Sequence, residues 1–182
     1  MVNICKLELS LLQQRILSHL FIHAGMAFTA HALANGLNVS QPGIAKALPA
    51  LEKKALITVQ KDRQSGRLAI EMNRDSIEVV RFKRAHNLMQ VYESGLARFL
   101  EDSFPGAAII LFGSYSRGDD TATSDIDIAV IGRKEKALDF SSYEKALARK
   151  IIVNYYDNLP AVHKALRENI CNGIVLAGGI SL

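Results

Sequence analysis

Two aspartates one residue apart, Asp125 and Asp127, are the side chains of this sequence whose types and spacing point most directly to chemistry. They open the apolar run 126–131, and side chains at positions i and i+2 of a strand project from the same face. Two carboxylates held that close repel each other unless a cation lies between them, and Mg²⁺ prefers such hard oxygen ligands. The pair therefore predicts a divalent-cation site at the start of a strand.

A Gly-Ser dipeptide lies ten residues before the aspartates. Gly113 and Ser114 follow the apolar segment 107–112, and a turn there offers backbone N–H groups and a hydroxyl to phosphate oxygens. Arg117, in the loop after Ser114, is expected to approach the same phosphates. A Gly-Ser dipeptide alone marks only a turn, and an Asp-x-Asp pair alone is consistent with a solvated strand edge. Their combination between apolar segments predicts a site that handles a nucleotide.

The pattern Gly-Ser-x3-Gly-x5-Ser-Asp-x-Asp resembles the signature of the polymerase-beta-like nucleotidyltransferases, particularly the minimal nucleotidyltransferases. This resemblance covers residues 85–178 and implies transfer of a nucleoside monophosphate from a nucleoside triphosphate to an acceptor hydroxyl. In that family two Mg²⁺ ions activate the acceptor and stabilise the leaving pyrophosphate. The residues that the resemblance assigns are Gly113, Ser114 and Ser124 for the nucleotide, and Asp125 and Asp127 for the two Mg²⁺ ions.

The same family uses a third carboxylate on the next strand as a metal ligand and as the base for the acceptor. The candidate strand here is 150–156, and its polar residue, Asn154, lies where the family would place an aspartate. An amide ligates Mg²⁺ weakly and cannot accept a proton at neutral pH. Asp157 is three residues further on and faces the other side of a regular strand, so it could replace the missing carboxylate only through a bulge. The expected catalytic set is therefore Asp125, Asp127 and Asn154, with a missing base.

Residues 1–76 are predicted to form a separate domain with three helices and a hairpin. Ser10, Thr29 and Ser40 are the expected N-caps, and the second helix is expected to stop at Asn35-Gly36. Two alternating strands, 56–61 and 67–72, then flank a polar, basic tip. This order resembles the winged helix-turn-helix fold. Pro49 inside the third helix predicts a kink or an early end, because proline deletes a backbone hydrogen bond.

The basic excess of the chain lies in this first part. Residues 1–77 hold nine Lys or Arg and five acidic residues, whereas residues 78–182 hold thirteen of each. A local excess of this kind indicates a polyanionic partner, and the resemblance implies double-stranded DNA. The expected contacts are Ser40, Gln41 and Lys46 on the third helix, and Lys61, Arg63 and Arg67 on the wing. A protein-interaction module with solvated charges is the alternative.

The segment 77–102 is predicted as one long helix joining the two parts, with Arg81, Lys83 and Arg84 on a solvated face. The remaining expected elements are strands at 107–112, 126–131 and 150–156, helices at 140–149 and 160–171, and an edge strand after residue 173. The predicted fold class is therefore α+β: a winged helix-turn-helix domain at 1–76, and a nucleotidyltransferase-like domain at 77–182 with a mixed sheet flanked by helices.

Composition limits the setting of this chemistry. Nearly half of the 182 residues are hydrophobic, but the longest apolar stretch is far too short to cross a bilayer, so we expect a cytoplasmic protein. Cys5 and Cys171 lack a metal-binding spacing and are expected to be reduced thiols.

Three functions remain open from the sequence. The first is a Mg²⁺-dependent nucleotidyltransferase tethered to DNA or to a protein partner by its winged helix. The second is a transcriptional regulator whose catalytically weak transferase half senses a nucleotide. The third, implied by the resemblance alone, is an antitoxin that nucleotidylates a helical protein partner. A homodimer is expected if the winged helix binds a palindrome.

Overall fold

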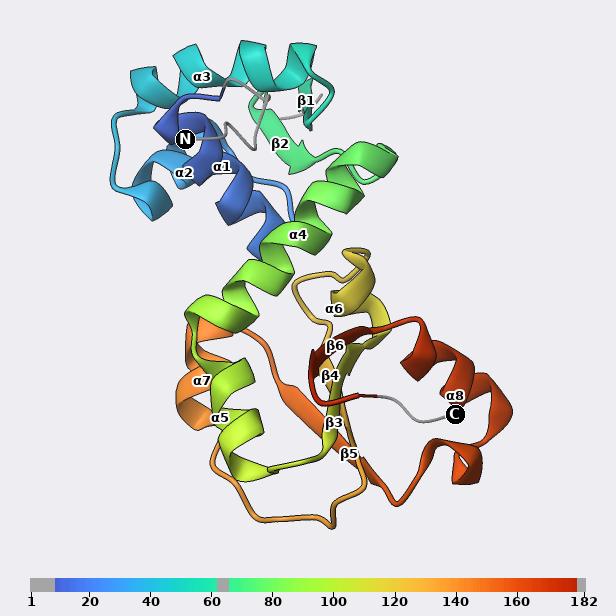
Figure 1. Ribbon diagram of the computed structural model, residues 1–182. Coiled ribbons are helices and arrows are strands. Elements are labelled where there is room, and N and C mark those ends of the chain that lie inside the picture. Colours follow the sequence, from blue (N-terminus) through green and yellow to red (C-terminus); the bar gives the residue numbers. More distant parts are fainter. Residues whose placement is uncertain (1–8, 62–65, 180–182) are drawn as a thin grey trace, which may run out of the picture. The chain divides into compact units, whose positions relative to one another are not determined.

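The computed structural model describes residues 9–61 and 66–179 (Figure 1). The chain divides into two compact units, Met1–Val79 and Val80–Leu182. The wing tip at 62–65, with Arg63, and the N-terminal segment that contains Cys5 lie outside the described residues.

The first unit begins with three helices, α1 (Leu11–Ile22), α2 (Ala30–Leu37) and α3 (Gln41–Lys53). Each starts after a predicted N-cap. Ser10 forms a full capping box, and the hydroxyls of Thr29 and Ser40 accept hydrogen bonds from backbone N–H groups at 3.1 and 3.2 Å. These side chains satisfy backbone donors that have no partner inside the helix, so the helices begin where the sequence predicts.

The expected stop of the second helix at Asn35-Gly36 is wrong, and so is an early end of the third helix at Pro49; the alternative of a kink at Pro49 stays a prediction. α2 continues beyond Asn35-Gly36 to Leu37, and Asn38 ends it in the left-handed conformation with φ 52. Burial of Leu37 explains the additional residue, since apolar packing outweighs weak local stop signals. α3 also runs on past Pro49 to Lys53. Pro49 itself is exposed, while Leu48 and Leu51 are buried and hold the helix together on its inner face.

The hairpin follows as predicted. β1 (Ile57–Lys61) pairs antiparallel with β2 (Leu68–Met72), with Lys61 opposite Leu68. Buried side chains from all three helices and from β2 form the core of this unit; they include Ile16, Leu20, Leu33, Ile44, Leu51 and Ile70. Three helices followed by an antiparallel hairpin make a winged helix-turn-helix unit.

A helical pair precedes the sheet of the second unit: α4 (Ile77–Glu93) and α5 (Leu96–Ser103). The prediction of one continuous helix over 77–102 is therefore wrong. The break falls at Gly95, whose φ of +80 is a conformation that side chains with a Cβ rarely adopt. The interruption lets Leu96 and Leu100 pack into the same core as Val91.

The sheet has four strands, β3 (Ala108–Phe112), β4 (Ile126–Ile131), β5 (Ile151–Tyr156) and β6 (Ile174–Ala177). Their order is β5-β4-β3-β6, and β4 and β5 run parallel while the other pairs are antiparallel. The connecting helices are α6 (Gly113–Arg117), α7 (Ser141–Leu147) and α8 (Lys164–Cys171), with a 3₁₀ turn at Leu159–Ala161. The mixed sheet confirms the α+β class, although α7 is shorter than predicted and the helix expected at 160–171 is divided.

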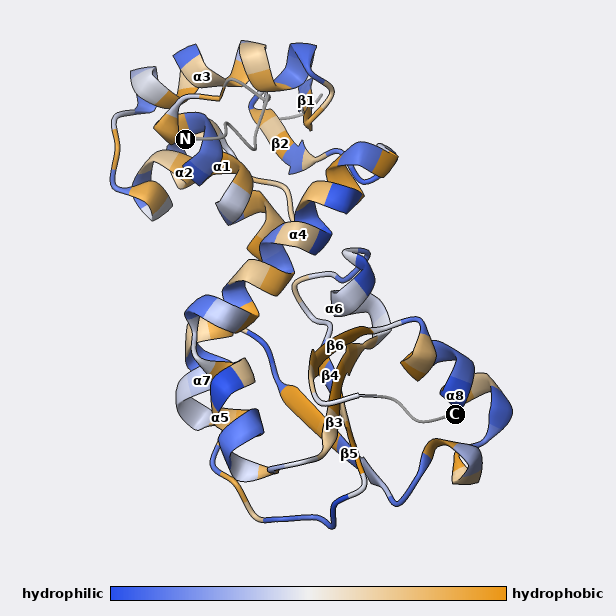
Figure 2. Ribbon diagram, viewed as in Figure 1, coloured by the Kyte–Doolittle hydropathy of each residue, from blue (hydrophilic) through white to orange (hydrophobic). Residues whose placement is uncertain are grey.

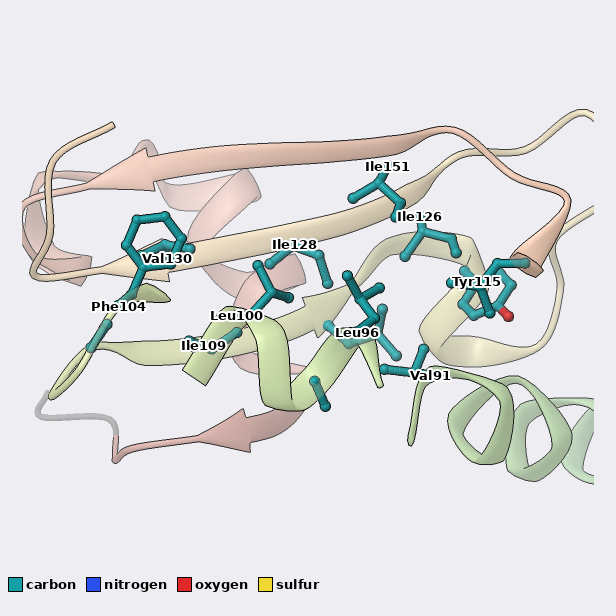
Figure 3. Close-up of a cluster of buried hydrophobic side chains, with 14 residues drawn as sticks. Val91, Leu96, Leu100, Phe104, Ile109, Tyr115, Ile126, Ile128, Val130 and Ile151 are labelled. Atoms are coloured by element: carbon teal, nitrogen blue, oxygen red, sulfur yellow. The ribbon is translucent and has the colours of Figure 1, made fainter. Parts of the chain in front are cut away.

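Alternation along the strands distributes side chains to two layers, with α5 and α7 over one face of the sheet and α8 over the other (Figure 1). Figure 3 shows the first layer, where Leu96 and Leu100 of α5 meet Ile109, Ile128 and Val130. The smaller second layer is formed by Ile110, Phe112, Ala129, Leu159, Val162 and Ile170. Both layers draw on the apolar strands, whose largely orange segments are visible in Figure 2.

In the described ranges, no helix combines the length and the apolarity needed to span a bilayer.

Candidate functional site

The Gly-Ser segment and the second aspartate are in direct contact. The register of β3 and β4 pairs Phe112 with Asp127, so Gly113, the next residue, lies beside the Asp127 side chain. Gly113 has φ +74, and a Cβ added to it would overlap Oδ2 of Asp127 and lie 3.1 Å from its Cγ. Only glycine combines this conformation with this close approach. The predicted phosphate-binding residues and the predicted metal ligand therefore form one site.

The two aspartates act on each other electrostatically. Asp127 is half-buried in β4, whereas Asp125 precedes the strand and is exposed. Partial burial raises the pKa of Asp127, the negative charge of Asp125 raises it further, and the guanidinium of Arg117 lowers it. Repulsion between two carboxylates on the edge of a polar site is what a bound divalent cation would relieve. This donor set fits Mg²⁺, which carboxylate oxygens bind well.

The other predicted nucleotide residues lie in α6 and in the loop that precedes β4. Ser114 is half-buried in the first turn of α6, and its carbonyl oxygen accepts a hydrogen bond from Gly118 at 2.9 Å. Arg117 is exposed and contacts Asp119 and Asn169, each at 3.2 Å. The hydroxyl of Ser124 accepts a hydrogen bond from the backbone N–H of Thr121 at 2.9 Å, which closes a tight turn just before Asp125.

β5 does not present Asn154 beside Asp127. The parallel register pairs Asn154 with Ala129, and the residue that pairs with Asp127 is Ile152. Asn154 projects from the same face as Asp127 but is two residue pairs further along the strands, and Ile152 is 44% exposed. The position in β5 nearest the aspartates thus carries an exposed apolar side chain.

Within residues 9–61 and 66–179, no further acidic or histidine ligand completes the aspartate pair. Among the residues that the structure describes, no group of three His, Cys, Asp or Glu side chains is arranged to hold a metal ion. A cavity of about 460 Å³ opens beside Asp125. Its charged lining consists of Asp125, Glu144, Lys145, Arg149 and Lys150. The site therefore offers two carboxylates for metal and a cavity of mixed charge on the side of β5.

A buried group of polar side chains next to the site was not predicted from the sequence. Lys83 of α4 is buried, not on the solvated face expected, and forms an ion pair with buried Asp120. Asn87, also on α4, and Arg149 contact the same carboxylate at 2.7 and 3.4 Å. Burial lowers the pKa of Lys83, and the charge of Asp120 opposes that shift. Lys83 and Asn87 lie four residues apart, in line with buried Val79 and Val91, and this spacing is the signal that was available in the sequence.

Comparison with known proteins agrees with this geometry. A family model for the nucleotidyltransferase domain matches residues 93–175. The chain is also 35% identical over 82 residues to the protein of Methanocaldococcus jannaschii named "Putative protein adenylyltransferase MJ1379", a match that covers 40% of this chain and 82% of that protein. The chain belongs to the nucleotidyltransferase family. The resemblance found in the Gly-Ser and Asp-x-Asp pattern is thereby confirmed.

Two solved structures are similar over about half of this nucleotidyltransferase chain. Adhesin competence repressor (AdcR) from Streptococcus pyogenes is 22% identical with a TM-score of 0.44, and the match covers 56% of this chain and 71% of that one. The S. aureus MepR–DNA complex is 24% identical with a TM-score of 0.40, and the match covers 53% of this chain and 80% of that one.

The predicted DNA-binding residues of the winged helix unit lie mostly at its surface. Gln41 and Lys46 are exposed on α3, and Ser40 is exposed as its N-cap. Lys61 ends β1 at the base of the wing and is exposed. Arg67 and Gln41 line the same cavity of about 360 Å³, so the start of α3 and the wing meet there. Arg63 lies outside the described residues.

Proposed function

We propose that the chain binds a Mg²⁺–nucleoside triphosphate and transfers its nucleoside monophosphate to an acceptor hydroxyl. The observation that carries this proposal is the contact between Gly113 and Asp127, because it joins a phosphate-binding bend to a metal-binding carboxylate. Gly113, Ser114, Ser124 and Arg117 would hold the triphosphate, and Asp125 and Asp127 would hold Mg²⁺. The name of the M. jannaschii relative supports ATP as the donor and a protein as the acceptor.

The reaction forms a bond between the acceptor oxygen and the α-phosphorus, breaks the bond from that phosphorus to the pyrophosphate, and releases the proton of the acceptor hydroxyl to solvent. Bound Mg²⁺ supplies Lewis-acid stabilisation of the charge on the phosphates. In the sheet, Gly113 lies on the β3 side of the aspartates and the cavity lined by Glu144, Lys145 and Lys150 lies on the β5 side. Nucleophile and leaving group are opposite each other in an in-line displacement, which supports entry of the acceptor from the β5 side.

The test is transfer of label from each of the four nucleoside triphosphates, labelled at the α-phosphate, to protein or added acceptors in the presence of Mg²⁺. We expect Asp127→Asn to abolish incorporation and Asp102→Asn, an exposed acid on α5, to leave it unchanged. If Asp127→Asn incorporates label at the same rate as the unmodified protein, the proposal fails.

A second candidate is a nucleotide-responsive regulator that turns over slowly or not at all. The observation that favours it is Ile152 opposite Asp127, where a carboxylate would be needed to ligate a second ion and take the acceptor's proton. We expect Ile152→Asp to raise transfer by at least about tenfold if the missing carboxylate limits the rate. If the chain is instead a regulator, we expect the unmodified protein and Ile152→Asp both to bind Mg²⁺–ATP without turnover. The DNA affinity of each should then change when ATP is added.

DNA binding through residues 1–76 completes the proposal. Its support is the basic excess of that part of the chain, together with exposed Gln41 and Lys46 at the start of α3. A helix in this position reads the major groove with its N-terminal side chains, while wing residues such as Lys61 and Arg67 contact phosphates. A gel-shift assay with fragments from the region upstream of its own gene tests this part separately from transfer.

A further inference from the structure

A cluster of buried polar side chains lies below the nucleotide site; we call Lys83, Asn87, Asp120 and Arg149 the buried cluster. Lys83 and Asp120 are 0% and 1% exposed, and Asn87 and Arg149 are also buried. The Asp120 carboxylate accepts hydrogen bonds from Lys83 and Asn87 on Oδ1 and from Arg149 on Oδ2. Lys83 and Arg149 therefore share the single negative charge of Asp120 in the interior. Removing these charges from water costs free energy, and apolar side chains of similar size often give equal or greater stability.

One amide of the buried cluster joins the two halves of the site. Asn87 Nδ2 donates both to the Tyr115 carbonyl oxygen at 2.9 Å and to Asp120 Oδ1 at 2.7 Å. Tyr115 follows Gly113 and Ser114 in α6, and Asp120 lies in the loop that leads from α6 to Asp125. The phosphate-binding half and the metal-binding half are thus bonded to the same side chain of α4.

Short-range hydrogen bonds hold together the segment between Asp120 and Asp125. Thr121 donates its backbone N–H to the Ser124 hydroxyl at 2.9 Å, and Ser124 donates its own N–H to the Thr121 carbonyl at 3.1 Å. The loop is therefore a closed turn with one end fixed in the interior and the other at the start of β4. A displacement of Asp120 would be passed on to Asp125.

Two further contacts fix the same parts. A Cβ at Gly118, where α6 ends, would overlap the Val80 carbonyl oxygen and lie 2.7 Å from the Arg84 nitrogen, so the backbone there is pressed against α4. Arg149 lines the cavity that Asp125 also lines, and its Nη1 donates to the Ala148 carbonyl at 2.9 Å. The buried cluster thus also holds the segment that precedes β5.

We propose that Asn87 and Asp120 are positioning residues, which set the affinity for Mg²⁺–nucleotide by fixing Gly113–Arg117 and the loop that ends at Asp125 to α4. The proposal deepens the proposed function and rests on it for the nucleotide. It assigns the buried cluster a purpose beyond stability, because directional hydrogen bonds specify the place of each segment, which apolar packing does less strictly.

Two variants separate positioning from stability. Asn87→Leu removes the amide that bridges Tyr115 and Asp120 while keeping similar bulk. The triple variant Lys83→Met, Asp120→Leu, Arg149→Met replaces the buried charges by apolar side chains, a change that is often neutral or stabilising. Asp102→Asn is the control, since its ion pair with Arg98 on α5 is exposed and remote in sequence from the site.

Affinity for Mg²⁺–ATP by calorimetry and the unfolding temperature are measured for each full-length protein. We expect the dissociation constant to rise about tenfold or more in Asn87→Leu and in the triple variant, because small misplacements of site residues are costly. The triple variant is expected to keep an unfolding temperature near that of the unmodified protein. The proposal is overturned if Asn87→Leu binds Mg²⁺–ATP as tightly as the unmodified protein does. It is also overturned if the triple variant keeps both the Mg²⁺–ATP affinity and the unfolding temperature of the unmodified protein. If the triple variant does not fold, Asn87→Leu decides alone.

Hydrogen exchange without nucleotide distinguishes failure of this inference from failure of the proposed function. We expect faster amide exchange in Asn87→Leu over residues 114–125, with no change in α5. If the unmodified protein binds no Mg²⁺–ATP, the proposed function fails, but this exchange result still stands. Exchange over 114–125 that equals that of the unmodified protein refutes the positioning role whatever the nucleotide result.

Discussion

Replacing Asp127 by asparagine is expected to stabilise the protein without Mg²⁺ and to destroy its response to Mg²⁺–ATP. The aspartate is half-buried and repelled by Asp125, and both effects disappear with the charge. Residues i and i+2 of a strand are about 6.6 Å apart. At that separation two like charges repel by roughly 0.6 kcal/mol in water and roughly 2.5 kcal/mol at an effective dielectric constant of 20.

Because Asp125 is exposed, the value near the water limit applies, and we expect a gain of about 0.5–1 kcal/mol after solvent screening. For a chain of this size that corresponds to roughly 1–4 °C in unfolding temperature. With Mg²⁺–ATP at a hundred times its dissociation constant, the unmodified protein should gain about 2.7 kcal/mol. The variant should gain nothing, so the order of stability reverses.

The pH dependence follows from the direction of the shift. The folded-state pKa of Asp127 lies above its unfolded value, so folding disfavours the ionised form. The unmodified protein therefore gains stability as the pH falls through the folded pKa, and the advantage of Asp127→Asn is present above that pKa and vanishes below it. Thermal denaturation at several pH values, with and without Mg²⁺–ATP, measures both effects. A variant less stable than the unmodified protein in Mg²⁺-free buffer, or one that keeps the full Mg²⁺–ATP shift, refutes the reasoning.

Three other predictions concern the site and the winged helix. Gly113→Ala should cost about 1–3 kcal/mol and abolish the Mg²⁺–ATP shift, whereas Gly132→Ala, also at positive φ but with no atom within 4 Å of the added Cβ, should cost about 1–2 kcal/mol and leave the shift intact. Equal loss of the shift in both variants would contradict this reading of Gly113. Calorimetric affinity for Mg²⁺–ATP should fall as the pH is lowered through the folded pKa of Asp127, because protonation removes a metal ligand; a pH-independent affinity would exclude that role. Lys46→Ala should weaken DNA binding for all sequences alike and reduce the slope of log affinity against log salt by about 1, and an unchanged slope in filter binding would show that Lys46 contacts no phosphate.

Local chemistry explains why much of the fold was predictable. The caps at Ser10, Thr29 and Ser40 act on the next few backbone groups, so they mark helix starts without help from the rest of the molecule. Alternation likewise identified β1 and β2, and a short apolar run identified β4. The prediction of one helix over 77–102 is wrong because the apolar periodicity continues through Gly95. The break at Gly95 is explained only by tertiary packing, which places Leu96 and Leu100 in the core against the sheet.

The sequence by itself determined the reactive group types and their family: Gly-Ser, then Asp125 and Asp127 at strand spacing. Tertiary structure decided which residues meet. Strand register puts Gly113 beside Asp127 and Ile152, not Asn154, opposite it. Folding also drew Lys83 into the interior, because a partner 37 positions away, Asp120, compensates its charge there. The spacing of Lys83 with Val79, Asn87 and Val91 indicates a buried face of α4, but the partner of Lys83 depends on the packing of α4 against the loop that holds Asp120.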